Sequence, residues 1–182
     1  RKENKSLHNK QKNDKFTTGI VYMPITLAYL IAHFKKNNIK TKLFDLYGQN
    51  PTKCSQEGNS LIFGNSIENI DHQSFIGAKC FFINANQIAN HSSILDIVKF
   101  LKAKYKSIPI AVLENSQAVT AYSLSKVKNE FLKLGCEYII IGDLEKVALE
   151  VFKNLDNFEY LRNINGVITK NFHNEKINFV EK

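Results

Sequence analysis

The chain has 182 residues, which is enough for one α/β domain with a short appendage and too few for two full domains. Hydrophobic residues make up 43% of it, so the chain as a whole can bury a core and is not disordered. No run of 18 apolar residues and no signal-peptide pattern occurs. Three widely spaced cysteines form no CxxC, metal-ligand or disulfide pattern. We therefore expect a cytoplasmic protein without a membrane partner.

The formal net charge is +8, and half of it comes from residues 1–15, which hold six basic and two acidic side chains. Only Arg1 and Arg162 are arginines, and all other basic residues are lysines. Specific recognition of phosphates and bases relies on the planar fork of arginine. We therefore expect residues 1–15 to be a disordered basic arm or linker, and we expect no nucleic-acid partner.

Hydrophobic periodicity predicts alternating strands and helices after this arm. Residues 16–22 are expected to form a short strand, and Pro24 then opens a helix with the sequence ITLAYLIAHFKKN. Residues 41–46 are expected to form the next strand. Residues 52–76 carry scattered glycines and polar residues, so a loop with a short helix is expected there.

The second half of the chain gives a clearer pattern. Three continuous apolar segments, 79–84, 108–113 and 137–142, are typical of strands buried on both faces. Amphipathic helices are predicted after each of them, the second of which ends at Gly135. The tail predicts a hairpin with GVIT as its first strand, a turn at 171–175 and KINFV as its second strand.

This alternation predicts an α/β fold with a doubly wound, mostly parallel sheet of Rossmann-like or flavodoxin-like type, in the strand order 2-1-3-4-5. The division we expect is a domain over 16–160, followed by a C-terminal β-hairpin or extension over 161–182. In such sheets a ligand binds beyond the carboxyl ends of the strands, where the strand order reverses. Any functional site is therefore expected at that edge.

Polar residues follow each of the three buried strands. Their side chains can bond amides and phosphate, and the helix that begins near Ser92 adds N–H groups at its amino end. The predicted ligand-binding residues are Asn84, Asn86, Gln87, Glu114, Asn115, Ser116, Gly142 and Asp143.

No catalytic signature occurs in the chain. GxGxxG, GxxxxGK[ST], GxSxG and HExxH are all absent, and the five histidines are scattered, with only His91 near a strand exit. We interpret Asp143 and Glu145 as acids favoured at a helix N-terminus rather than as an acid–base pair. The prediction is that this chain alone catalyses nothing and contains no catalytic residue or metal ligand.

The order of three segments resembles a known family. MPITLAYLIAHFKKNNIKTKLFDL (23–46) resembles the Pro–helix–strand–Asp stretch of the cobalamin-binding domains of radical SAM enzymes. CEYIIIGDLEKVALEVFKNL (136–155) is similar to the strand, Gly-Glu-Gly-Glu turn and Leu-rich helix of that family. INGVITKN (164–171) resembles the strand that precedes the radical SAM barrel.

The resemblance implies a Rossmann-like domain that binds cobalamin at the carboxyl edge of the sheet, within a methyltransferase-type radical SAM protein. It also implies a barrel domain, in cis or in trans, that carries an iron–sulfur cluster and uses S-adenosylmethionine. The CxxxCxxC motif of that barrel is absent, and the chain's end at Lys182 leads us to expect an excised or freestanding domain. Asn84 stands at the position of the family's Ser, and 113–116 stands at that of its Gly-Gly.

Two other functions stay open. The chain could be a degenerate Rossmann-like interaction module that no longer binds cobalamin, because Glu114 and Asn115 would crowd a ligand where glycine lets it approach. Nucleic-acid binding through residues 1–15 ranks third, and it predicts an affinity that falls steeply with salt.

Overall fold

The computed structural model describes most of the chain, and its contacts divide the chain into two units. The smaller unit comprises Arg1–Met23 and Lys42–Ile76, and the larger comprises Pro24–Thr41 and Gly77–Lys182. None of the helices in the described residues has the length and apolar character that a bilayer crossing requires. The described residues are 2–4, 25–57, 60–114 and 123–175.

The larger unit contains a four-stranded sheet in the order β4-β5-β6-β7. β4, β5 and β6 pair in parallel, and β7 pairs antiparallel to β6. This arrangement confirms the predicted α/β class and the mostly parallel sheet. The strands are β4 (Phe81–Ala85), β5 (Ile110–Glu114), β6 (Tyr138–Ile140) and β7 (Val167–Ile168).

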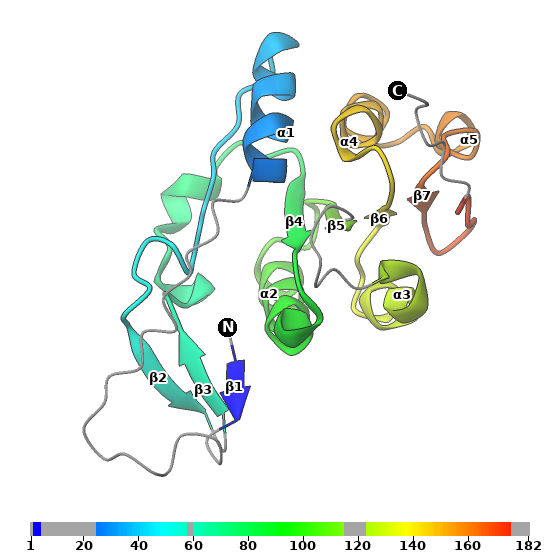
Figure 1. Cartoon of the computed structure of the whole chain (residues 1–182). Helices are drawn as coiled ribbons and strands as arrows, with labels where there is room; N and C mark the ends of the chain where they lie inside the picture. The colour runs from blue at the N-terminus through cyan, green and yellow to red at the C-terminus, as the bar shows by residue number, and fades with distance from the viewer. Residues whose placement is uncertain (1, 5–24, 58–59, 115–122, 176–182) are drawn as a thin grey trace. The chain divides into compact units, whose positions relative to one another are not determined.

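Helices cover both faces of this sheet. α1 and α4 lie on one face, and α2 and α3 lie on the other (Figure 1). The predicted helices are confirmed to within a few residues, whereas the short α5 was not predicted. The helices are α1 (Ile25–Lys36), α2 (His91–Lys104), α3 (Leu124–Lys133), α4 (Leu144–Lys153) and α5 (Phe158–Leu161).

Side chains of the central strand alternate between two separate cores. Ala111 and Leu113 of β5 pack with α1 and α4, whereas Ile110 and Val112 pack with α2 and α3. All four are fully buried. A strand buried on both faces requires an uninterrupted apolar sequence, which explains why IPIAVL identified β5 so clearly.

A partly buried network joins β5, β6 and α2 at the amino edge of the sheet. The Glu137 carboxylate accepts a hydrogen bond from the backbone N–H of Ile110 at 2.8 Å and forms an ion pair with Lys102 of α2. Lys102 also donates to the backbone carbonyl of Ile108 at 3.3 Å. Two strands and one helix are thereby fixed relative to each other where the strands begin.

The smaller unit holds an antiparallel three-stranded sheet in the order β1-β3-β2. β1 falls within the predicted arm, of which residues 5–15 lie outside the described residues. The β2–β3 pairing replaces the loop with a short helix expected over 52–76, although two 3-10 turns follow it, Ile67–Asn69 and His72–Phe75. The strands are β1 (Lys2–Asn4), β2 (Cys54–Glu57) and β3 (Ser60–Phe63).

The strand predicted at 41–46 is wrong, because these residues form no strand. The carboxylate of Asp45 accepts a hydrogen bond from the Gly48 N–H at 2.8 Å, which turns the chain there. The ring of Phe44 packs on Phe75 within the smaller unit, with the ring centroids 5.2 Å apart. The predicted order 2-1-3-4-5 is therefore not confirmed, and its first strand, 16–22, lies outside the described residues.

The predicted C-terminal hairpin is present in part. The Thr169 N–H donates to the Phe172 carbonyl at 2.8 Å, and the Asn174 N–H donates to the Val167 carbonyl at 3.0 Å. The turn thus begins at Thr169, two residues before the predicted 171–175. The predicted second strand, KINFV, lies outside the described residues.

Gly166 gives a stability prediction. Its φ is 88°, and a Cβ atom added there would collide with the backbone carbonyl oxygen of Ile141. Gly135 has a similar φ of 91°, but its added Cβ would meet only side-chain carbons of Lys102 at ordinary contact distance. We expect Gly135→Ala to lower the free energy of unfolding by about 1 to 2 kcal/mol. Gly166→Ala should cost clearly more in urea unfolding, and equal losses would contradict this account.

The buried thiol of Cys136 gives a pH prediction. Its Sγ donates to the carbonyls of Ile110 and Tyr138, and burial raises the pKa of the thiol from 9.0 to about 12. Between about pH 9 and pH 12 the unfolded chain has lost a proton that the folded chain keeps, so stability falls as pH rises. In urea unfolding between pH 8 and pH 11, Cys136→Ala should make that fall shallower. Substitution of the exposed Cys54 with Ala is the matched control.

Candidate functional site

The carboxyl edge of the parallel strands brings three polar exits together. Asn84 pairs with Leu113 in register, and Leu113 pairs with Ile140, so β4, β5 and β6 end side by side. Neighbouring strands lie about 5 Å apart, which places these exits along one edge. Of the predicted binding residues, Asn115 and Ser116 lie outside the described residues, and the other six are described.

Three buried polar atoms lie near this edge, one on β4 and two at the start of α2. Asn84 is in register with Leu113, which packs with α1 and α4, so the Asn84 side chain lies on the face opposite to α2. Asn84 lies in β4, Asn90 is the N-cap residue of α2, and Ser93 lies in the first turn of that helix. Among the described residues, Asn84 Oδ1, Asn90 Oδ1 and Ser93 Oγ have no hydrogen-bond partner, although each atom is buried. Buried polar groups are nearly always paired, so these three atoms are free to accept hydrogen bonds from a ligand.

The loop between β4 and α2 holds the other two predicted residues of this exit. The side-chain amide of Asn90 donates to Asn86 Oδ1 at 2.9 Å across a 3-10 turn, Ile88–Asn90. This bond orients both side chains. Neither Gln87 nor Asn90 caps its own helix through the side chain. The N–H of His91, the first residue of α2, donates to the Ile88 carbonyl of the 3-10 turn, so the backbone supplies part of the cap.

Glu114 serves the protein rather than an open site. Its Oε1 accepts a hydrogen bond from the N–H of Leu124, the first residue of α3, at 3.0 Å. Ser123 precedes α3 but makes no cap bond through its side chain, so Glu114 supplies the cap from the end of β5. Burial raises the pKa of the Glu114 carboxyl group above its ordinary value. The sequence did not indicate this role.

Asp143 and Gly142 connect β6 to α4. Asp143 is the N-cap of α4, where its carboxylate accepts from the N–H of Lys146 at 3.5 Å and pairs with the Lys146 ammonium at 3.3 Å. Glu145 lies in the first turn of the same helix. The interpretation of both acids as helix N-terminal acids is confirmed. Gly142 has a positive φ of 84° at the turn itself.

His91 joins two helices. Its Nε2 lies 3.1 Å from Glu130 Oε2 of α3, and its ring meets Phe131 edge-on with the centroids 5.5 Å apart. Over the described ranges, no three His, Cys, Asp or Glu side chains gather where they could hold a metal ion. The edge therefore offers hydrogen-bonding groups suited to binding, and these residues show no nucleophile–base pair.

Sequence reasoning missed Ser93 and Asn90 as site residues. Both residue types are common before and within the first turn of a helix, so their pattern predicts capping. The available signal was that Asn84, Asn86 and Asn90 stand within one short segment after a buried strand. Only the structure shows that the side chain of Asn90 does not cap α2.

Comparison with known proteins adds no relative to this description. No protein-family model, curated protein or solved structure matches the chain. The assignment of a function therefore rests on the fold, the carboxyl edge and the segments that resemble a known family.

The cap supplied by Glu114 can be tested by substitution. Glu114→Ala removes the acceptor for the Leu124 N–H and should lower the free energy of unfolding by about 1 kcal/mol. Glu114→Gln keeps a side-chain oxygen at the same place and should retain most of that stability. Thermal unfolding followed by circular dichroism measures both variants. Equal losses in the two variants would show that the hydrogen bond to α3 is not what Glu114 contributes.

Proposed function

We propose that this chain is a cobalamin-binding-type domain that holds its ligand at the carboxyl edge of the sheet and has no catalytic activity of its own. The observation that carries the proposal is that Asn84 Oδ1 on β4, and Asn90 Oδ1 and Ser93 Oγ at the start of α2, are each buried without a partner among the described residues. A ligand that donates hydrogen bonds to these atoms removes the cost of about 1 to 3 kcal/mol of leaving a buried polar group unsatisfied.

The chemistry of cobalamin fits this donor and acceptor set. Its corrin ring carries primary amides, which donate hydrogen bonds to amide and hydroxyl oxygens such as those of Asn84 and Ser93. Its nucleotide tail carries a phosphate, and the N–H groups at the amino end of α2 favour an anion. The residues present therefore suit a large ligand that has amides and one phosphate.

The placement of α1 supports a Rossmann-like topology. β4, β5 and β6 follow one another across the sheet, and α2 and α3 between them lie on one face. α1 packs on the opposite face with α4. Because crossovers are right-handed, a helix on the opposite face serves strands that progress in the opposite direction. We propose that the strand order reverses at β4, which puts the ligand at the exit of β4.

We propose that a partner domain carries out the reaction of the whole protein. In the proposed arrangement a radical SAM barrel, in cis or in trans, supplies the iron–sulfur cluster and S-adenosylmethionine for methyl transfer. The residues of this chain would bind and orient the cobalamin. The support is the resemblance of 136–155 and 164–171 to the segments that precede such a barrel.

A second function is favoured by a different observation. Glu114 places a carboxylate at the exit of β5, where the resembling family has glycine, and the hydrogen bond to Leu124 holds it there. Such a group narrows the space for a ligand and repels its phosphate. The second candidate is therefore a Rossmann-like protein-interaction module that keeps the fold without cobalamin.

Retention of hydroxocobalamin tests the first function. The pure chain is mixed with hydroxocobalamin and desalted, and the corrin absorbance that stays with the protein is measured. We expect the wild type to retain the corrin and Asn84→Ala to reduce the retained fraction severalfold, because the unpaired amide is removed. Asn163→Ala is the matched control, since Asn163 is exposed and its side-chain amide donates to the Glu159 carbonyl of α5. It should retain as much corrin as the wild type.

A double variant separates the two functions. Glu114→Gly/Asn115→Gly restores the small residues of the resembling family and should raise retention if those side chains restrict the crevice. Retention that does not change with Asn84→Ala would show that the site is wrongly chosen. If neither the wild type nor the double variant retains corrin at any accessible concentration, the cobalamin proposal fails and the interaction module takes its place.

A further inference from the structure

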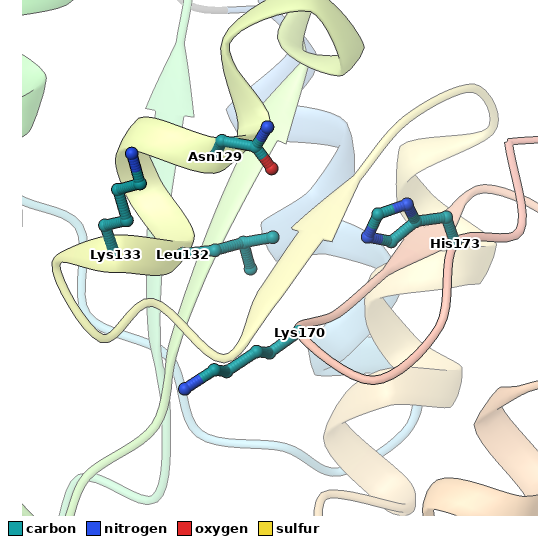
Figure 2. A pocket seen from close by; sticks show the side chains of 5 residues that line it. All are labelled: Asn129, Leu132, Lys133, Lys170 and His173. Carbon is teal, nitrogen blue, oxygen red and sulfur yellow. The ribbon is translucent and has the colours of Figure 1, made fainter.

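A second concave site lies between α3 and the C-terminal turn. Figure 2 shows Asn129, Leu132 and Lys133 of α3 on one wall, and Lys170 and His173 on the other. The cavity between them has a volume of about 450 Å³. Pockets of about 300 to 1,000 Å³ take small organic ligands, so the space suits a metabolite rather than a single ion.

Both walls are held in place by the fold. Leu132 is partly buried and packs against the core beneath α3. On the other wall, Thr169 is almost fully buried, and its Oγ1 accepts the N–H groups of Asn171 at 3.1 Å and Phe172 at 3.2 Å. Lys170 and His173 are thereby presented on a fixed turn rather than on a loose loop.

The polar groups of the groove are cationic or neutral. Lys133, Lys170, His173 and Asn129 make no hydrogen bond or ion pair through their side chains within the described part of the chain. The neighbouring carboxylates are engaged elsewhere, because Glu130 pairs with His91 and Glu175 pairs with Lys128. No carboxylate of the described residues lines the cavity, so the potential of these residues favours an anion.

The groove lies at the other edge of the sheet from the candidate site. β7 runs antiparallel to β6, with Ile168 opposite Ile139, so the turn after β7 lies toward the beginning of β6. α3 ends at Lys133 and leads through Gly135 into the same end of β6. The candidate site lies beyond the carboxyl ends of the strands, so neither site depends on the other.

We propose that this groove binds a small polyanion, a metabolite that carries a phosphate group or a cluster of carboxylates. Lys133 and Lys170 would pair with its charges from opposite walls, since lysine places a compact charge on a flexible stem. His173 and Asn129 would donate hydrogen bonds between them, and Leu132 would contact its carbon skeleton. Charge-assisted hydrogen bonds of this kind are the stronger ones in proteins.

Nuclear magnetic resonance titration of the ¹⁵N-labelled chain tests the proposal, with pyrophosphate and citrate as the probes. We expect saturable shifts at the amides of 129–133 and 169–174 with at least one probe, and the probe that binds better identifies the anionic group. Lys133→Gln/Lys170→Gln should raise the dissociation constant by about tenfold or more. Lys35→Gln/Lys36→Gln removes the same charge from exposed positions of α1, on the other face of the sheet, and should leave it unchanged.

Several results would overturn the proposal. Equal weakening by both double variants would show that only the net charge attracts the probe. The proposal also fails if neither probe gives saturable shifts, or if the shifts lie outside the two walls. Tighter binding of a single-stranded oligonucleotide, with shifts that extend along other lysines, would assign the charge to nucleic acid instead. Corrin retention is unaffected by this outcome, because Asn84 lies at the opposite edge.

Discussion

The fold of the larger unit depends on a strict alternation along β5 and β6, whose side chains point in turn into two separate cores. A shift of one residue in the pairing would exchange every side chain between the two faces. The network of Glu137, Lys102 and the Ile110 N–H opposes such a shift, since it pairs a side chain that precedes β6 with the first residue of β5. The same register determines which residues lie side by side at the carboxyl edge, because it aligns the ends of β4, β5 and β6.

The sequence predicted the strands and helices best where burial requires a regular pattern of apolar residues. β5 and β6 were predictable because strands covered on both faces need continuous apolar runs, and α2, α3 and α4 because each has one apolar face. β4 has a similar apolar run, although most of its residues are only partly buried. The segment 41–46 has the composition of a strand, but the hydrogen bond from Gly48 to Asp45 and the packing of Phe44 on Phe75 decide its conformation. The Asp45–Gly48 bond spans only three residues and is typical of a turn, whereas the local pattern carries no information on the contact of Phe44 with Phe75.

The candidate site shows the same division. The exits of the three strands were predictable, since parallel strands end at one edge and polar residues follow each apolar run. The role of each side chain was not. Glu114 bonds Leu124 ten residues later, and Asn90 bonds Asn86 instead of capping α2, so the partners depend on the path of the loops. Asp143 was interpreted correctly because an N-cap bond spans only three residues, so the local sequence predicts it.

The shortness of β7 has a consequence for solubility. With only Val167 and Ile168 in the strand, and a tight turn that follows at once, the sheet ends at β7 in a segment too short to template another chain. Long, flat edge strands recruit further strands and lead to aggregation, and short ones interrupted by turns do not. Both β7 side chains are buried, so the edge offers incoming molecules little apolar surface. The hairpin thus protects the β7 edge of the sheet from edge-to-edge association.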